Sequence, residues 1–511
     1  MRNYLLCILI FSFLSASSQN QTVGLFKYEP GTFTGYTLFS SGNNTYLIDN
    51  CGRRINTWSS SYKPGLSVYL LENGDLLRTC RIQSAIFGGG GSGGRVERRD
   101  WNNNLIWSYD FSSSLYHQHH DIEVMPNGNI LVLCWEYRTY NEAVSAGRDP
   151  NAIIDGNLFP TYIIEVEPQG TNSINIVWEW RIWDHLIQDF DSSKNNYGNV
   201  ASHPELLDIN FYNGNGKNDW LHCNSIDYNP QLDQIIICSR ALSEIYIIDH
   251  STTTAEAASH SGGNYGKGGD ILYRWGNPQV YRQANTQRLF GPHQAEWITQ
   301  TSNSDGKISI FNNGLGRDYS SVDIIDPPQN SNGEYYLNLN NIFGPDTAEW
   351  SYTAPNPLDF YADHISGAQR LPNGNTLICH GTHGTFFEVD NQKNVLWNYI
   401  SPITNTGPLV QGFSIPSSAN SWANSTFRAT KYSKNYPAFN GLNLTPGAPL
   451  ELLPFPSGCS IINSNYNIDN QTSQRPIKIL DLLGRPAKYE KNKVLIYIYD
   501  DGKVEKKLFL Q

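Results

Sequence analysis

An internal repeat constrains the fold of this 511-residue chain more than any other feature. A β-rich run with an acidic residue is followed by a polar turn and then by an aliphatic run that ends in tryptophan. A unit of this kind cannot bury its apolar face alone, so neighbouring copies are expected to stack into one core. Six copies occur, at residues 45–58, 95–107, 161–180, 245–275, 321–350 and 385–397.

A second unit, a hairpin of two strands, alternates with the first. It occurs at residues 67–77, 121–131, 225–237, 294–311 and 367–378. Asn-Gly between alternating apolar residues, as in DIEVMPNGNIL, is a strong hairpin signal. Two hairpins per repeat make a four-stranded blade, which is typical of propellers. Residues 424–432 can supply the missing strand of the first blade and close the ring without an open sheet edge. The repeat predicts an all-β fold, a six-bladed β-propeller over residues 22–450.

The composition agrees with this fold class and excludes some partners. The chain has 43 Gly, 26 Pro and 13% aromatic residues but only 16% charged residues, which favours strands and turns over helix bundles. The formal net charge is −11. Because phosphate groups are bound by clustered Lys and Arg, this charge argues against nucleic acid and anionic membranes as partners.

The N-terminus has the layout of a secretory signal peptide over residues 1–20. One early Arg precedes an apolar run and a group of small residues, in MRNYLLCILIFSFLSASSQN. The apolar run is too short to span a bilayer permanently, and no other run approaches that length. Leu6 is too bulky for a lipoprotein cleavage site before Cys7. We therefore expect an exported protein without a membrane span.

The C-terminus reads as a linker over residues 451–474 and a small β-sandwich-like module over residues 475–511. Strand patterns occur in IKILDLLG, VLIYIYDDG and VEKKLFLQ, with Asp-Gly as a hairpin turn. The order of Leu-Gly-Arg, Tyr-Ile-Tyr, Asp-Gly and a Lys-rich end resembles the C-terminal sorting domain of the type IX secretion system of the Bacteroidota. The resemblance implies the type IX secretion machinery as a partner, passage through the periplasm and across the outer membrane, removal of the tail, and a secreted or cell-surface protein.

Seven cysteines follow the signal segment, without a CxxC pair. A zinc ribbon is therefore disfavoured. One disulfide, for example Cys51 with Cys80, is possible in an oxidising compartment, although the sequence does not fix the pairing.

Polar residues converge where the innermost strands of the blades begin, because those strands line the central channel. His222 lies two residues before Asn224, which occupies one of these strand starts, and so points to the same side of its strand. Arg240 follows the next strand of that blade and can reach back to the channel mouth. His117 and His119 have no counterparts in the other blades and stay undecided. Alignment of the hairpins by their apolar positions places four polar residues on one ring: His120, Asn224, His293 and Ser366.

Three chemistries could use this ring. Zinc or copper would need a third or fourth His, Cys or carboxylate in register, where the ring supplies Asn and Ser. A Ser-His-Asp hydrolase would need a GxSxG elbow and a base beside Ser366, and neither is present. A histidine nucleophile with Arg and further imidazoles suits the transfer of a tetrahedral anionic group. The Gly-rich run FGGGGSGG (residues 87–94) lacks a Gly-Lys-Ser/Thr ending and precedes a strand, so it predicts an inter-strand loop and not a phosphate loop.

Four segments together resemble the arylsulfotransferase (aryl-sulfate sulfotransferase) family. The resemblance implies a six-bladed propeller that transfers a sulfuryl group from a phenolic sulfate ester to a phenol acceptor, without a nucleotide sulfate donor, through a sulfated histidine. The segments are HHDIEVMPNGNILVL (119–133), WLHCNSIDYNPQLDQIIICSR (220–240), FGPHQAEWI (290–298) and STFRATKYSKNYPAFNGLNLTPG (425–447).

The resemblance assigns roles to residues of the ring. It implies that His293 is the nucleophile, that His222 and Asn224 hold the sulfuryl oxygens, and that Arg240 stabilises their charge. His120 matches the histidine of the family's HHD hairpin, and either His222 or His120 would transfer the proton of the phenol. No metal and no organic cofactor is implied, and two half-reactions predict ping-pong kinetics.

One alternative function and one expectation about assembly remain open. The alternative is a non-catalytic secreted propeller that binds carbohydrate or protein. We expect a monomer, because the first repeat begins too near the N-terminus to leave room for the additional dimerisation domain found in some family members.

Overall fold

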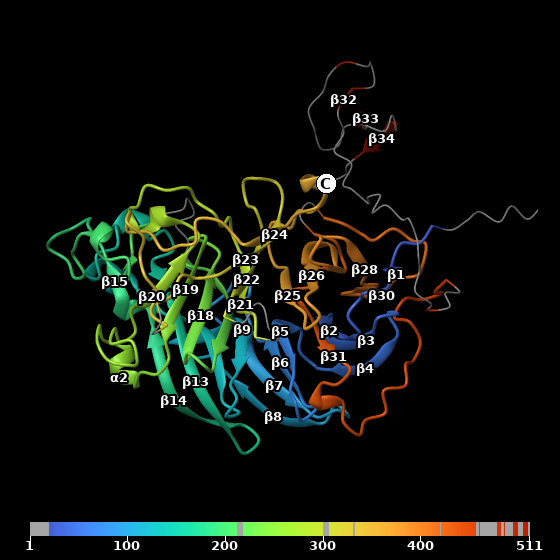
Figure 1. Cartoon of the computed structure of the whole chain (residues 1–511), viewed down its shortest axis with the longest axis horizontal. Helices are drawn as coiled ribbons and strands as arrows, with labels where there is room; N and C mark the ends of the chain where they lie inside the picture. The colour runs from blue at the N-terminus through green and yellow to red at the C-terminus, as the bar shows by residue number, and fades with distance from the viewer. Residues whose placement is uncertain are drawn as a thin grey trace, which may run out of the picture.

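The chain forms a six-bladed β-propeller in the computed structural model, as the repeats predict (Figure 1). Residues 1–19 lie outside the described residues, and so does nearly all of the predicted signal peptide. The structure describes residues 20–211, 218–299, 306–330, 333–418, 421–455, 459, 478–481, 485, 494–498 and 504–508.

Each blade is an antiparallel sheet whose first strand contacts the first strands of neighbouring blades around the axis. From the axis outward, blade 1 is β31 (Ala429–Ser433), β2 (Gly35–Ser41), β3 (Asn44–Asp49) and β4 (Arg54–Ser59); blade 2 is β5 (Pro64–Leu70), β6 (Leu76–Arg81), β7 (Gly94–Arg99) and β8 (Leu105–Asp110); blade 3 is β9 (Tyr116–Val124), β10 (Ile130–Glu136), β13 (Thr161–Gln169) and β14 (Ser173–Arg181).

The other three blades follow the same order. Blade 4 is β17 (Cys223–Asn229), β18 (Gln234–Ser239), β19 (Glu244–Asp249) and β20 (Ile271–Trp275); blade 5 is β21 (His293–Trp297), β22 (Ile308–Asn312), β23 (Ser321–Ile325) and β24 (Trp350–Tyr352); blade 6 is β25 (Gly367–Arg370), β26 (Thr376–His380), β27 (Thr385–Val389), β28 (Val395–Ile400) and β1 (Gly24–Tyr28).

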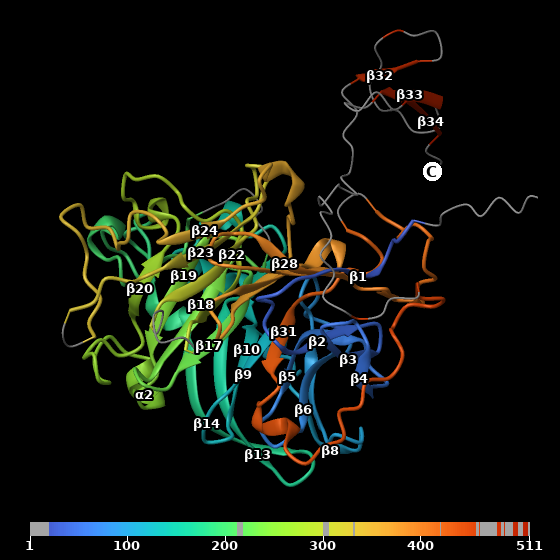
Figure 2. The same ribbon diagram turned by 45° about the vertical axis from the view of Figure 1, so that its right-hand side comes forward.

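The ring closes by pairing strands from opposite ends of the propeller. Near the C-terminal end, β31 pairs with β2 near the N-terminal end, with Tyr36 opposite Tyr432 and Leu38 opposite Thr430. Figure 2 shows β31 in orange-red beside β2 in blue. β1 adds a fifth, outer strand to blade 6. The predicted return of residues 424–432 to the first blade is thereby confirmed.

The tryptophans that end the repeats explain why the pattern recurs. Each lies on the fourth strand of its blade, and in the third repeat it is Trp178, two residues before the end of the repeat. Its indole N–H donates to a residue at or before the start of the fourth strand of the next blade. Such a bond satisfies the one polar group of a side chain that packs between blades. The pairs are Trp58 to Asp100 O, Trp107 to Ser173 O, Trp178 to Thr252 Oγ1, Trp275 to Pro345 O, Trp350 to Asn391 O and Trp397 to Asn50 O, at 2.7–3.2 Å.

Short helices and strands fill the connections. Both α-helices begin at a capping box, in which a Thr and the Glu three residues later satisfy each other's backbone N–H groups. No helix among the described residues is long and apolar enough to cross a membrane. These elements are α1 (Tyr140–Ser145), α2 (Thr254–Ala257), η1 (Pro150–Ala152), η2 (Ile182–His185), η3 (Val200–Ser202), η4 (Pro278–Tyr281), η5 (Pro357–Asp359), η6 (Gly381–His383), η7 (Pro437–Phe439), β11 (Arg138–Thr139), β12 (Asn157–Leu158), β15 (Leu186–Ile187), β16 (Leu207–Asp208), β29 (Ile403–Thr404) and β30 (Gly407–Pro408).

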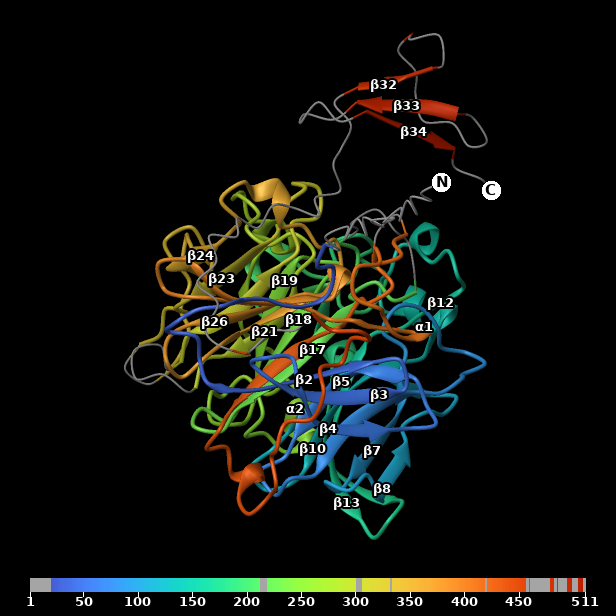
Figure 3. The same cartoon turned by 90° about the vertical axis from the view of Figure 1, so that its right-hand side faces the viewer.

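The C-terminal segment forms a separate antiparallel sheet (Figure 3). Its strands are β32 (Lys478–Leu480), β33 (Val494–Ile498) and β34 (Val504–Leu508), in the three places where the sequence predicts them. The predicted Asp-Gly turn and most of the predicted linker lie outside the described residues.

The disulfide differs from the example drawn from the sequence. Cys51, in the turn between β3 and β4, pairs with Cys459, which is 408 residues further along the chain. The Cys51–Cys80 pairing is wrong because Cys80 is a fully buried thiol on β6, inside blade 2. The bond therefore ties blade 1 to the chain that follows the propeller.

Candidate active site

A backbone irregularity recurs where the innermost strands begin. In blades 2 to 5 the register between the first and second strands shifts there, so each first strand carries a bulge. A bulge bends its strand and redirects the side chains beside it. Left-handed backbone, with φ between +43° and +110°, occurs at or near the bulges and before β25, at Leu66, His120, His222, Gln294 and Ser366.

His293, the predicted nucleophile, is held in one tautomer. Its Nδ1 lies 2.8 Å from Asn313 Oδ1. The amide nitrogen of Asn313 donates to Ala362 O and Ile365 O, which fixes its oxygen toward the imidazole. Nδ1 therefore carries the proton and Nε2 keeps its lone pair, toward which the Ile365 N–H points at 3.2 Å. Burial and then Arg240 hold the pKa of His293 well below its usual value, so the ring stays neutral.

His120 and His222 lie against each other with ring centroids 4.7 Å apart. Burial, and then His222, holds the pKa of His120 well below its usual value. His222 is more accessible, with a side chain 23% exposed, and its Nδ1 lies 2.6 Å from Asp219 Oδ2. Burial alone would raise the pKa of Asp219, but the His222 charge lowers it below its usual value. Asp219 is thus an anionic partner that holds the His222 ring through its Nδ1.

Arg240 and Asn224 connect the histidines to their surroundings. Arg240 lies directly after β18 and donates from its backbone N–H to His222 O and from Nη2 to Asp363 O. Its buried Nε has no hydrogen-bond partner among the described residues. Asn224 is fully buried, and its amide nitrogen donates to Pro292 O, directly before His293.

Several residues of the site were missed by the sequence reasoning. Asn313 follows the second strand of blade 5 as Arg240 follows that of blade 4, so extending the alignment to the second strands would have found it. His364 lies beside them with a 38% exposed side chain and Nδ1 2.5 Å from Asp363 Oδ1, and its charge contributes to the low pKa of His293. No repeat pattern indicates His364, because it lies in a connection.

The Gly-rich run forms the predicted inter-strand loop, between β6 and β7, but it also packs on the histidines. His120 N–H donates to Gly91 O at 2.7 Å, and Gly93 N–H donates to Gln118 O. A Cβ on Gly91 would overlap three atoms of the His120 ring, and one on Gly90 would contact His222. Only glycine permits this close approach, since Gly91 has a φ of +87°.

The two undecided histidines are placed away from the nucleophile. His117 is fully buried, with Nε2 3.1 Å from Ser92 Oγ and Nδ1 2.8 Å from Ser112 Oγ. His119 stacks on Trp135 at 4.5 Å and places its Nδ1 2.8 Å from Nδ1 of His120. His117 is thus a structural residue, whereas His119 orients the His120 ring.

A small cavity of about 70 Å³ is lined by residues that lie further along the innermost strands than the axial histidines. Burial raises the pKa of Glu296 to about 8 and that of Asp227 to about 7, and it also raises the pKa of Glu123. Glu296 accepts a hydrogen bond from Gln294 there, and Arg428 pairs with Asp121 at 2.9 Å. Glu296, three residues from the predicted nucleophile His293, is therefore largely protonated near neutral pH and would not repel an anionic substrate there.

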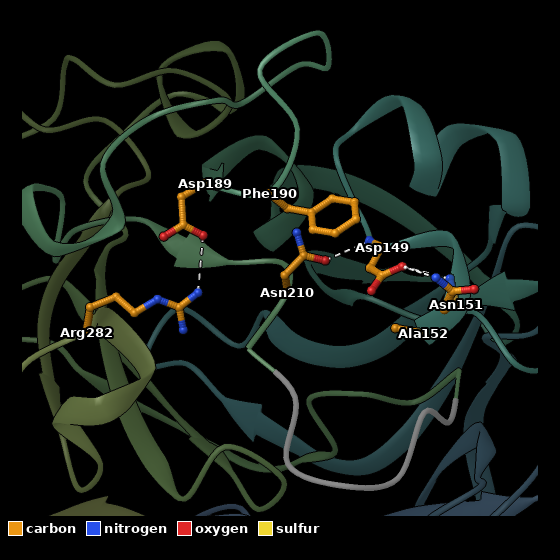
Figure 4. A pocket seen from close by; sticks show the side chains of 7 residues that line it. All are labelled: Asp149, Asn151, Ala152, Asp189, Phe190, Asn210 and Arg282. Carbon is orange, nitrogen blue, oxygen red and sulfur yellow. Dashed lines mark hydrogen bonds and ion pairs between the residues drawn. The ribbon is translucent and has the colours of Figure 1, made fainter.

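A larger hollow of about 720 Å³ lies elsewhere, between connections of blades 3 and 4 (Figure 4). Figure 4 shows Arg282 reaching toward Asp189, at 3.3 Å, with Phe190 beside them. The carboxylates of Asp149, which is half-buried, and Asp189, which is exposed, disfavour an anionic substrate, and none of the axial histidines lines this hollow. The chemistry therefore points to the axis and not to the larger hollow.

Comparison with known proteins identifies one family. The model of the family described as Arylsulfotransferase (ASST) matches residues 40–407. No curated protein matches the sequence of the chain. Similar solved structures include a protein of unknown function from Bacteroides caccae (11% identity, TM-score 0.40, 78% of this chain and 98% of that one) and a putative 6-phosphogluconolactonase from Bacteroides fragilis (10%, 0.36, 79% and 99%). At TM-scores below 0.5, these similarities bear on neither fold nor function.

Proposed function

The chain belongs to the arylsulfotransferase family, and we propose that it transfers a sulfuryl group from a phenolic sulfate ester to a phenol through His293. The observation that carries the proposal is the hydrogen bond from His293 Nδ1 to Asn313 Oδ1. It keeps the lone pair on Nε2, the atom that would attack sulfur, in a ring that its environment keeps neutral.

The first half-reaction forms the bond from His293 Nε2 to sulfur and breaks the bond from sulfur to the phenolic oxygen. The electron pair of the broken bond stays on the phenolate. Arg240 and the Nε2–H of His222 supply positive charge and a hydrogen-bond donor for the sulfuryl oxygens. Asn224 contributes by positioning, since its amide holds the backbone before His293.

A proton must reach the departing phenolate and must leave the incoming phenol. Of the two candidates from the sequence, His222 is favoured, because its side chain is partly exposed and Asp219 orients its ring through Nδ1. His120 is buried and kept neutral, which suits contact with His222 better than proton exchange. His364, with Asp363 on its Nδ1, is a second accessible acid and base. In the second half-reaction the phenol oxygen attacks sulfur and His293 leaves.

This chemistry uses only side chains, so neither a metal nor an organic cofactor takes part in it. The test is the release of 4-nitrophenol from 4-nitrophenyl sulfate with phenol as acceptor. We expect turnover with ping-pong kinetics, a sulfuryl adduct on His293 by mass spectrometry, and loss of both in His293→Ala but not in His203→Ala, whose exposed ring pairs with Glu205. Equal release by wild type and His293→Ala would exclude the nucleophile, and no release by the wild type would exclude the activity.

We further propose that the protein is exported as a monomer and delivered to the cell surface or the medium by type IX secretion. The Cys51–Cys459 disulfide supports export, because such bonds persist in oxidising compartments. The three C-terminal strands occur in the order expected of the sorting domain. Mass spectrometry of the protein from the culture medium, with and without residues 475–511 encoded, tests the route: export that does not depend on those residues would rule it out.

A further inference from the structure

Three side chains outside the axial site converge between blades 3 and 4: His185, His260 and Asp270. His185 ends η2, His260 lies in the connection after α2, and Asp270 directly precedes β20. One ligand atom from each lies within 4.8 Å of the other two. Figure 1 shows α2 and β20 on the outer left of the propeller, away from β9 and β21 of the axial site.

The hydrogen bonds of this group point two imidazole nitrogens at one carboxylate oxygen. Nδ1 of His185 lies 2.7 Å and Nδ1 of His260 2.8 Å from the same oxygen of Asp270. His185 Nε2 lies 2.8 Å from Ala257 O, which can only accept, so Nε2 carries a proton. In a neutral His185, Nδ1 then presents a lone pair to a carboxylate oxygen. This lone pair and the carboxylate oxygen are two ligand atoms that face each other, as the ligands of a bound cation do.

We propose that His185 Nδ1, His260 Nδ1 and a carboxylate oxygen of Asp270 bind a zinc ion, with water as the fourth ligand. Two imidazoles and one carboxylate suit zinc, with bonds of about 2.0–2.2 Å. Tetrahedral ligands at those lengths lie roughly 3.3 Å apart, so the group must open by about half an ångström. His260 allows this, because its side chain is 62% exposed.

The surroundings of His185 are those of an oriented metal ligand. Its second nitrogen donates to a backbone carbonyl, the usual partner that fixes a ligating imidazole. Trp180 stacks on its ring at 5.8 Å and donates to Gly269 O at 2.8 Å, which anchors the segment before Asp270. A Cβ on Gly269 would lie 2.6 Å from His185 Nε2, so glycine permits the approach. The orientation of the His185 ring is thus set by its neighbours, and the exposed His260 side chain can adjust around the ion.

Zinc here would join the connection after α2 to the end of blade 3, and its water would face solvent on the His260 side. It would act independently of the sulfuryl-transfer site. The competing arrangement, an imidazolium of His185 paired with Asp270, needs no metal and predicts no saturable binding.

Zinc titration of the full-length, chelator-treated protein against a competing chromophoric chelator tests the site. We expect one equivalent bound, at least tenfold weaker binding in His260→Ala, and unchanged binding in His203→Ala, a matched exposed histidine paired with Glu205. Cobalt substituted for zinc should show tetrahedral absorption bands in the wild type and in His203→Ala, but not in His260→Ala. His222→Ala tests whether zinc binds at the axial histidines instead, and we expect its zinc binding to equal that of the wild type.

Three results would overturn the proposal: no saturable binding by the wild type, full binding by His260→Ala, or loss of binding in His222→Ala. A thermal melt checks that each variant is folded. Zinc should raise the melting temperature of the wild type and of His203→Ala, but not that of His260→Ala, because only a ligand that binds the folded state stabilises it.

Discussion

Substitution of Gly91 by alanine should impair catalysis while leaving the fold intact. Gly91 has a φ of +87°, and its Cβ would overlap the His120 ring. Gly128, in the turn between β9 and β10, has the same φ of +87° but has nothing within 4 Å of the position that a Cβ would take. Gly128→Ala is therefore a control that carries the backbone strain without the collision.

The two effects have separable magnitudes. A left-handed alanine costs about 1–2 kcal/mol of stability, and both variants should lose this amount. Only Gly91→Ala must in addition displace the His120 ring, by roughly 1 Å, and a shift of that size in an active site can reduce turnover about 100-fold. The displaced ring would disturb His222, whose ring centroid lies 4.7 Å from that of His120.

The assay compares the turnover of 4-nitrophenyl sulfate by the two variants at a temperature where both are folded. We expect Gly91→Ala to be about 100-fold slower than Gly128→Ala and to have a lower denaturation midpoint, because only its Cβ must displace a buried ring. Equal turnover would show that the position of His120 does not matter, and the contact between loop and ring would then be only structural.

Three further predictions concern other parts of the molecule. Asn313→Asp places a carboxylate on His293 Nδ1 and raises the pKa of His293, so the acidic limb of the kcat/KM profile should move to higher pH; an unmoved limb would contradict the tautomer argument. Burial raises the pKa of Glu296 from 4.5 to about 8, so the contribution of Glu296 to stability is complete below about pH 4.5 and is lost as the pH rises toward 8. The melting temperature of the wild type should therefore fall across that range, and Glu296→Gln should make this fall smaller. Cys51→Ser should lower the free energy of unfolding by roughly 2–5 kcal/mol, and reduced wild type should match it in chemical denaturation.

The repeat made the blades and the axial ring predictable. Each outer tryptophan and each hairpin recurs because every blade meets the same two neighbours, so one pattern repeats around the ring. Positions equivalent in the repeat, such as His120 and His293, are then brought to one level of the axis. Arg240 was found because it directly follows the second strand of the His222 blade, and Asn313 could have been found because it follows the second strand of the next blade.

Residues in the connections have no repeat position, and there the sequence was uninformative. The partner of Cys51 lies 408 residues away, beyond the propeller, and no pattern relates the two positions. His364 approaches His293 from the connection between blades 5 and 6. Asp219 was also missed: it lies three residues before His222 and bonds both its ring and its backbone, but no repeat position indicates it.

The bulges explain why the ring was found but not the orientation of each side chain. An alignment by apolar positions fixes how far along its strand a residue lies, and it places His120 and His293 at equivalent positions of their innermost strands. In blade 3 the left-handed residue is His120 itself, whereas in blade 5 it is Gln294, one residue after His293. Since a bulge redirects the side chains beside it, His120 contacts His222 in the next blade while His293 bonds Asn313 in its own. Two histidines with the same repeat position thereby acquire different partners, which suits one for nucleophilic attack and the other for orienting its neighbour.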